Sequence, residues 1–116
     1  MPNKAYTLRF SKVNRDSWNA IRLGAKKIET RAATVRYREI RAGDTLAFVC
    51  GRTRFKKRAR RVRIFPTVAS LLRTYRVTDI NPYLSSAKEL RAKYDSFSKY
   101  REKIRRHGLI AIELKE

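Results

Sequence analysis

The chain has 116 residues, of which 42% are hydrophobic, and its 30 Lys and Arg residues outnumber its 10 Asp and Glu residues. This length predicts one domain spanning residues 1–116, and the apolar content excludes a disordered chain. A net charge of +20 repels itself in a compact state, so we expect a polyanion as the partner.

Several classes of protein are excluded by what the sequence lacks. Cys50 is the single cysteine, which excludes an intrachain disulfide and a thiolate metal site. No run of about 18 apolar residues predicts a membrane span, and the opening segment MPNKAYTLRF lacks the apolar core of a signal peptide. We therefore expect a cytoplasmic monomer that uses no metal and no cofactor and does not bind membranes.

The first elements in chain order are a strand and a helix. Apolar and polar residues alternate over 6–10, which predicts a strand with one buried face. Asn14 or Asp16 can cap a short helix that Gly24 ends, with Trp18 on its buried face.

Two further strands are expected before the middle of the chain. Residues 27–31 form a short strand entered from the glycine turn, and 32–40 form a loop or extended segment. The Gly43-Asp44 pair marks a turn before the apolar run over 46–50, which predicts a third strand.

The segment 51–65, GRTRFKKRARRVRIF, is strongly basic yet carries apolar residues such as Phe55 and Val62. We predict a long twisted strand or a hairpin arm whose basic side faces solvent or ligand. So many like charges repel one another unless phosphates neutralise them. We therefore predict nucleic-acid contact by the cations of this basic arm, which are Arg52, Arg54, Lys56, Lys57, Arg58, Arg60, Arg61 and Arg63.

The last part of the chain predicts helices and a closing strand. Ser86 and Glu89 have the spacing of a capping box, which begins a helix. Helices are expected over 68–75, 86–94 and 98–108. The apolar run 109–114 predicts an interior strand that pairs with an early strand. This order of elements indicates an α+β fold, a small mixed β-barrel with flanking short helices.

The segment from Gly24 to Arg31 carries the most informative cluster. On an extended chain Lys27, Glu29 and Arg31 share one face, so Glu29 can pair with these neighbours while Ile28 enters the core. A cation beside a carboxylate in a cleft supplies phosphate binding and acid/base capacity. An exposed ladder of ion pairs, the alternative, contributes little.

This cluster and the strand after it resemble the G-x-K-x-x-E-x-R and G-D-x-Φ-x-F patterns of the ASCH domain family, in the PUA-like superfamily. The matching residues are Gly24, Lys26, Glu29, Arg31, Gly43, Asp44, Leu46 and Phe48. The resemblance extends over 65–72, 88–94 and 107–112. It implies a PUA-like β-barrel with a cleft that holds RNA or modified nucleosides, lined by Lys26, Glu29 and Arg31.

Some ASCH-like proteins are enzymes, which implies an alternative function. Acetylcytidine amidohydrolases use a motif lysine, a threonine and a later glutamate; Lys26 matches the lysine, Glu29 replaces the threonine, and Glu89 is the nearest later acid. Ribonucleases would use Lys26 with Tyr37 or Tyr94, although a tyrosine with a pKa of about 10 is a poor base. In this alternative the catalytic residues are Lys26, Glu29 and Tyr94.

The first hypothesis is a module that binds nucleic acid, expected to be RNA. The enzyme described above is the second hypothesis, and a structural role on a large RNA is the third. Beyond the basic arm, the predicted contacts are Lys26, Lys27, Arg31, Arg36, Tyr37 and Arg38. Phe55 and Tyr37 are candidate stacking platforms, whereas the helical spacing of Trp18 favours the core. His107 is interpreted as a helix-terminal histidine.

Overall fold

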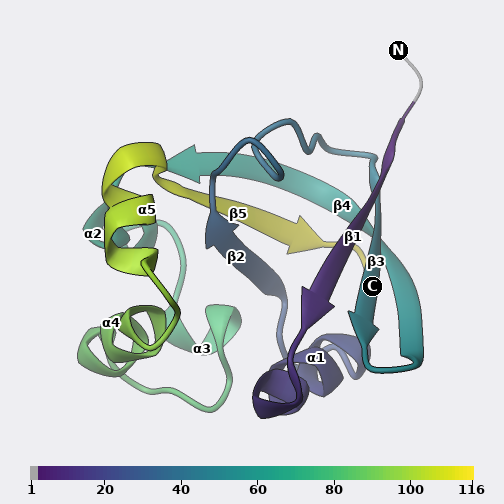
Figure 1. Cartoon of the computed structure of the whole chain (residues 1–116), viewed down its shortest axis with the longest axis horizontal. Coiled ribbons are helices and arrows are strands. Elements are labelled where there is room, and N and C mark those ends of the chain that lie inside the picture. Colours follow the sequence, from purple (N-terminus) through teal and green to yellow (C-terminus); the bar gives the residue numbers. More distant parts are fainter. Residues whose placement is uncertain (1–2) are drawn as a thin grey trace.

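The computed structural model describes residues 3–116 as a curled five-stranded sheet with short helices (Figure 1). The strands are β1 (Ala5–Phe10), β2 (Ile28–Ala32), β3 (Thr45–Cys50), β4 (Thr53–Phe65) and β5 (Leu109–Leu114). The helices are α1 (Arg15–Arg22), α2 (Val68–Leu72), α3 (Val77–Ile80), α4 (Ala87–Asp95) and α5 (Tyr100–His107), with a 3-10 turn η1 (Lys12–Asn14). The predicted α+β class is confirmed.

The sheet has the strand order β1-β3-β4-β5-β2, so β1 and β2 are its two edges. β1 pairs in parallel with β3, and the other neighbours are antiparallel. The sheet curls into a half-barrel, and helices α2 to α5 gather on one side while α1 lies apart from them (Figure 1). The predicted barrel is therefore open between β1 and β2, which share no ladder.

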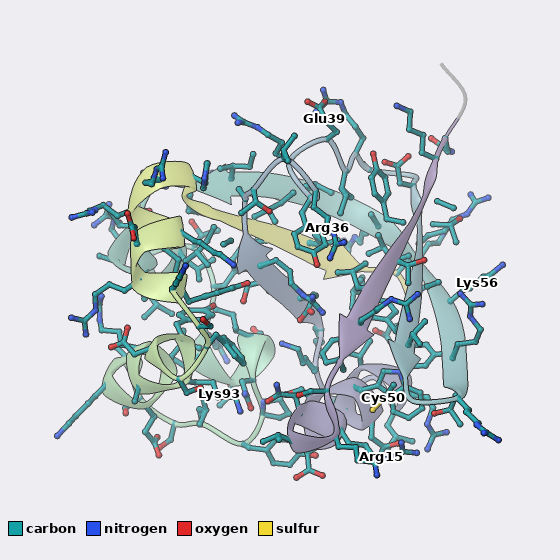
Figure 2. All side chains as sticks on the ribbon, in the orientation of Figure 1. Arg15, Arg36, Glu39, Cys50, Lys56 and Lys93 are labelled. Atoms are coloured by element: carbon teal, nitrogen blue, oxygen red, sulfur yellow. The ribbon has the colours of Figure 1, made fainter. Side chains whose placement is uncertain are left out.

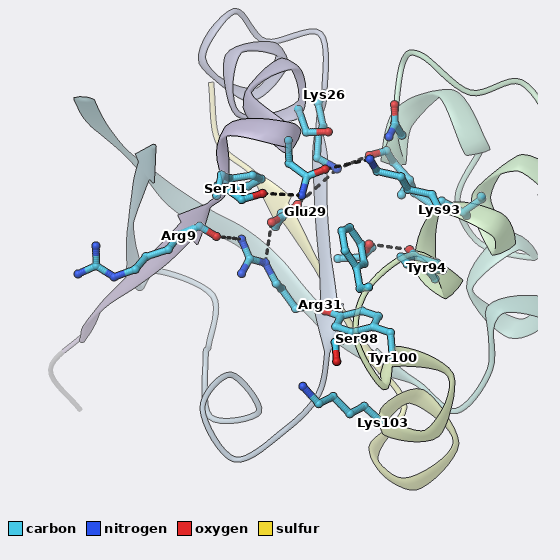
Figure 3. A pocket seen from close by; sticks show the side chains of 18 residues that line it. Arg9, Ser11, Lys26, Glu29, Arg31, Lys93, Tyr94, Ser98, Tyr100 and Lys103 are labelled. Atoms are coloured by element: carbon cyan, nitrogen blue, oxygen red, sulfur yellow. Dashed lines mark hydrogen bonds and ion pairs between the residues drawn. The ribbon is translucent and has the colours of Figure 1, made fainter. Parts of the chain in front are cut away.

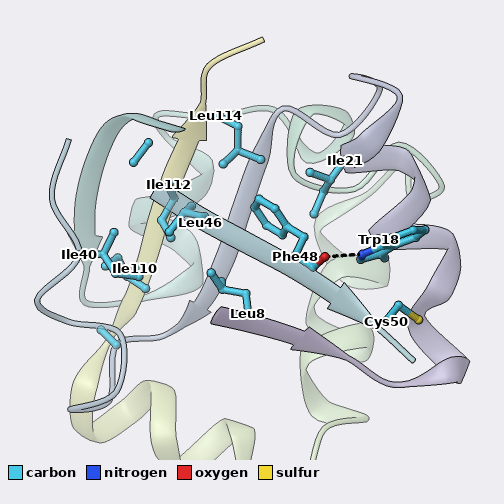
Figure 4. Packing of buried hydrophobic residues seen from close by; sticks show 12 residues of the cluster. Leu8, Trp18, Ile21, Ile40, Leu46, Phe48, Cys50, Ile110, Ile112 and Leu114 are labelled. Atoms are coloured by element: carbon cyan, nitrogen blue, oxygen red, sulfur yellow. Dashed lines mark hydrogen bonds between the residues drawn. The ribbon is translucent and has the colours of Figure 1, made fainter. Parts of the chain in front are cut away.

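Strand β5 is buried on both faces, as its apolar sequence predicts. Ile110 and Ile112 point into the half-barrel, where they join Phe48 and the α1 residue Trp18. The indole Nε1 of Trp18 donates to the carbonyl of Phe48 at 3.0 Å (Figure 4). Leu109 lies in a second cluster with the helices on the other face. Trp18 is a core residue, as its spacing indicated.

Strand β4 keeps most of its cations outside by alternation and, at Arg60 and Arg61, by a β-bulge. Phe55, Ala59 and Val62 face the inner cluster. Between Ala59 and Arg61 the register shifts by one residue against β5, so Arg60 is the extra residue of the bulge. The shift restores the inward position of Val62 after two consecutive arginines. Seven cations are therefore exposed, namely Arg52, Arg54, Lys56, Arg58, Arg60, Arg61 and Arg63.

The ends of the last helices follow local signals. The side chain of Ser86 accepts from the backbone N–H of Glu89 at 3.1 Å, and the Glu89 carboxylate accepts from the N–H of Ser85 at 2.8 Å. The predicted capping box is therefore present, except that the Glu89 carboxylate bonds the backbone N–H of Ser85 instead of that of Ser86. Helix α5 begins at Tyr100 rather than near 98, and it ends at His107 before Gly108.

Replacing Gly108 by alanine is expected to destabilise the fold by about 2–5 kcal/mol, since backbone strain and a clash add together. Gly108 has φ +78°, and a Cβ there would lie 2.5 Å from the carbonyl oxygen of Phe65. Gly51 has φ +59° and open space around it, so Gly51→Ala should cost only about 1–2 kcal/mol. Urea unfolding compares the two variants, and equal costs would contradict a role for the Phe65 contact.

Candidate functional site

A cavity of about 380 Å³ opens beside the β1 and β2 edges and extends to helices α4 and α5 (Figure 3). This volume is in the range of small-molecule sites. Strand residues supply Arg9, Phe10, Glu29, Thr30 and Arg31. The remaining lining residues come from loops and helices: Ser11, Asn14, Ser17, Lys26, Ile80, Asn81, Leu90, Lys93, Tyr94, Phe97, Ser98, Tyr100 and Lys103.

The Glu29 carboxylate lies between two cations in this cavity. Its Oε1 is 3.3 Å from Nζ of Lys26, and its Oε2 is 2.9 Å from Nε of Arg31. Glu29 and Lys26 are 3% and 5% exposed, so this is a buried charge network rather than a surface ladder. Burial of charges is tolerable here because each charge has a partner and hydrogen bonds.

Three protein acceptors surround the ammonium group of Lys26. Its ammonium bonds the carbonyl oxygens of Ile28, at 3.1 Å, and Ile80, and it meets Glu29. Three N–H donors thus face three acceptors. Burial lowers the pKa of Lys26, and the Glu29 carboxylate opposes this effect. Lys27, expected to share the Glu29 face, is exposed instead, because both lysines precede the strand and escape its alternation.

Arg31 connects the two edge strands. Its Nη2 donates to the carbonyl of Arg9 at 3.1 Å, and its Nη1 donates to the hydroxyl of Tyr37 at 3.2 Å. The guanidinium also lies over the Phe10 ring, 4.8 Å from its centroid. Burial works against the charged form, but Glu29 and Tyr37 outweigh it and raise the pKa of Arg31. Arg31 is therefore a fixed cation at the open side of the half-barrel.

Aromatic rings from α4 and α5 form another wall of the cavity. Tyr94 and Tyr100 stack with centroids 6.2 Å apart, and Phe97 meets Tyr100 edge-on at 5.1 Å. The hydroxyls of Tyr94 and Thr30 are 2.6 Å apart, and the Tyr100 hydroxyl accepts from the N–H of Ala32 at 2.8 Å. Burial raises the pKa of Tyr94 above its ordinary value.

The lining is strongly cationic. It holds one carboxylate, that of Glu29, against four cationic side chains, which are Lys26, Arg31, Lys93 and Lys103. Arg9 contributes its backbone carbonyl, and its side chain extends away from Glu29 (Figure 3). Lys26 and Arg31 already surround Glu29, whereas the Nζ of Lys93 donates to the neutral amide oxygen of Asn14 at 2.9 Å. Such a charge excess attracts an anion, and the rings beside it offer faces for stacking.

The structure brings Lys26, Glu29, Arg31 and Tyr94 together in this cavity, where the sequence analysis grouped them. Tyr37 is half-buried and reaches the network only through Arg31. Arg36 and Arg38 are exposed on the loop before β3, and like Lys27 they do not line the cavity. Glu89 does not line it either, because its carboxylate is used in the cap of α4.

Six charged or aromatic lining residues were not predicted from the sequence: Arg9, Phe10, Lys93, Phe97, Tyr100 and Lys103. The last four sit on or between two charged helices, where their residue types alone do not distinguish a cavity wall from a solvated face. Helical spacing gives no signal for them either, because Phe97 lies between the end of α4 at Asp95 and the start of α5 at Tyr100.

The basic arm differs from prediction at two positions. Lys57 is half-buried, and its Nζ donates to the carbonyl of Ile21 at 2.6 Å and meets the Glu116 carboxylate at 3.3 Å. Phe55 packs between Trp18 and Phe48, with centroids 5.2 Å from each, so it is not a free stacking platform. The other seven arm cations pair with no carboxylate among residues 3–116.

Within residues 3–116, His, Cys, Asp and Glu side chains form no group of three that could hold a metal ion. None of the helices in that range is long and apolar enough to cross a membrane.

The chain matches no protein-family profile, and no curated protein is similar enough to count as a relative. Solved structures with a similar fold include the following two. The crystal structure of hypothetical protein PH0355 has 22% identity and a TM-score of 0.78, covering 97% of both chains. The solution NMR structure of protein PF0455 from Pyrococcus furiosus has 25% identity and a TM-score of 0.74, covering 96% of both chains. These likenesses establish a shared fold.

Glu29→Gln is expected to lower the free energy of unfolding by about 3–5 kcal/mol, because two buried cations lose their counter-charge. The matched control is Glu39→Gln, since Glu39 pairs with Arg41 at 3.7 Å and both side chains are more than 60% exposed. That pair should contribute less than about 1 kcal/mol. Urea unfolding measures both, and similar small losses would show that Glu29 does not hold the network together.

Tyr94→Phe should change the pH dependence of stability. The raised pKa of Tyr94 means that its proton stays on in the folded state, whereas the unfolded chain releases it above about pH 10. The resulting stabilisation is present below pH 10 and lost as the pH rises. Relative to Tyr94→Phe, the wild type should therefore lose up to about 1.4 kcal/mol per pH unit above pH 10.

Urea unfolding at pH 8, 10 and 11 measures this difference, because the other titrating groups are common to both proteins. Tyr83→Phe is the control, since Tyr83 is 61% exposed. A constant difference between wild type and Tyr94→Phe across this range would contradict the buried phenol.

Proposed function

We propose that this chain is an RNA-binding domain of the ASCH kind in the PUA-like superfamily, a single domain that holds an unpaired nucleotide in its cavity and phosphates on its basic arm. The observation that carries the proposal is the composition of the cavity wall, where four cationic side chains and three rings of the α4–α5 region lie around one neutralised carboxylate. An anionic ligand with a flat ring system fits this wall, and a nucleotide has both features.

The extent of the positive charge favours a polynucleotide over a free nucleotide. Arg9 lines the cavity, and its register partner Val49 on β3 pairs in turn with Arg54 of the arm. A row with a cation at each end, Arg9 and Arg54, therefore leads from the edge of the cavity across the sheet to β4. One bound nucleotide would leave the arm cations without a counter-charge, whereas a strand that continues onto the arm neutralises them.

Binding is favoured over hydrolysis by the state of the candidate catalytic groups. Three protein acceptors surround the Lys26 ammonium, and the Tyr94 hydroxyl bonds Thr30 with a raised pKa. A general base needs a free lone pair and a pKa near the working pH. Glu89, the candidate later acid of an amidohydrolase, does not line the cavity. These residues serve to build the cavity and to position Arg31.

A direct test measures RNA binding by fluorescence anisotropy at several salt concentrations. The wild type should bind a labelled single strand with affinity that falls steeply with salt. Lys93→Gln/Lys103→Gln removes two cavity cations, and if each meets a phosphate the log–log salt slope should fall by about 1.4. The control Lys88→Gln/Arg106→Gln removes the same charge from exposed positions outside the cavity.

A wild type that binds no RNA at low salt would overturn the proposed function. An equal change in both double variants would show that net charge, and not the cavity, controls binding. Gel analysis of the same RNA after incubation tests hydrolysis, and a product that Lys26→Met fails to form would restore the enzyme hypothesis.

A further inference from the structure

The outer face of strands β1, β3 and β4 has an unusual composition. The inner side chains of these strands, such as Leu8, Phe48 and Phe55, pack in the half-barrel. The alternate side chains therefore point outward. Three cross-strand rows result from the register, namely Ala5–Thr45–Arg58, Thr7–Ala47–Lys56 and Arg9–Val49–Arg54. Helices α2 to α5 lie at the other end of the sheet (Figure 1).

This face combines small side chains with cations. Its middle strand presents Thr45, Ala47 and Val49, and the outer positions of β1 add Ala5 and Thr7. Arg9 and the β4 residues Arg54, Lys56 and Arg58 border this strip on its two sides, as labelled Lys56 illustrates in Figure 2. None of the nine positions, all within the described strands, carries a carboxylate or an aromatic ring.

Each of these features restricts which kind of nucleic acid this face can bind. Proteins that hold single strands stack bases on aromatic rings, and this face has none. Duplexes are instead recognised through shape and phosphate contacts. Small side chains allow a wide, rigid partner to approach the sheet closely, while the cations at the border reach its phosphates. The cations on β4 follow one another every second residue, about 6.8 Å apart along the strand.

We propose that the outer face of β1, β3 and β4 docks a nucleic-acid duplex through its phosphate backbones, and that it is separate from the cavity. This inference rests on the proposed function and specifies the strand state of the ligand. Arg9 connects the two surfaces, because its carbonyl accepts from Arg31 at the cavity while its side chain extends away from Glu29 (Figure 3). The ligand is therefore a duplex segment next to an unpaired nucleotide.

Binding of two RNA probes tests this docking face. One probe is a blunt duplex of about 20 base pairs, longer than the ~16 that a small duplex-binding domain spans, and the other is one of its strands alone. Arg54→Gln/Lys56→Gln/Arg58→Gln should reduce the log–log salt slope for the duplex by about 2.7 if each cation meets one phosphate. The slope for the single strand should change less.

Two controls separate charge from position. Arg73→Gln/Lys88→Gln/Arg106→Gln removes three exposed cations from the helical side and should leave duplex binding close to that of the wild type. Thr7→Tyr keeps the charge and a strand-forming residue but places a ring on the small-residue strip. It should weaken duplex binding without changing the salt slope, because the ring obstructs contact with the sheet.

The outcomes distinguish the two proposals. A wild type that binds neither probe contradicts the proposed function itself. The wild type could bind both probes while the triple arm variant keeps the full salt slope for the duplex. That result would overturn the proposal of a docking face but leave the proposal of RNA binding in place. Equal slope losses for duplex and single strand would show that the arm follows one strand and does not dock a duplex.

Discussion

One buried carboxylate organises the functional part of this fold. Glu29 compensates two cations, Lys26 and Arg31, that could not be buried without it. Through Arg31 the same network reaches the backbone of Arg9, so it links two edge strands that share no ladder. A side chain rather than strand pairing spans the open side of the half-barrel. The cavity lies at this opening, where a continuous ladder would have left no space.

The cations discussed above fall into two groups, those buried in the cavity wall and those exposed on the basic arm. Lys26 and Arg31 are held by protein acceptors and act as fixed parts of the wall. The exposed arm cations have no carboxylate partner within residues 3–116, so their mutual repulsion persists in the folded protein. A phosphate backbone would relieve that repulsion. The bulge at Arg60 contributes directly, because it keeps consecutive arginines outside while Val62 returns to the core.

The two surfaces differ in the ligands that they suit. The cavity offers rings such as Phe97 and Tyr100 beside cations, which fits one unpaired nucleotide. The outer sheet face offers small residues bordered by cations, which fits a duplex backbone. Arg9 belongs to both, since it lies in an outward row and also lines the cavity. A domain with these surfaces would recognise the shape of a nucleic acid and the position of an unpaired base together.

The sequence by itself determined the features that depend on local periodicity. Alternation identified β1, and apolar runs identified β3 and β5. The Ser86 cap identified α4, and the grouping of Lys26, Glu29 and Arg31 followed from their separation of only five residues. Tertiary structure decided which lysine contacts Glu29 and whether the barrel closes. It also placed Tyr100 in one cavity with residues some 70 positions earlier in the chain. Those outcomes depend on how distant elements pack their apolar faces, and no short-range pattern encodes that packing.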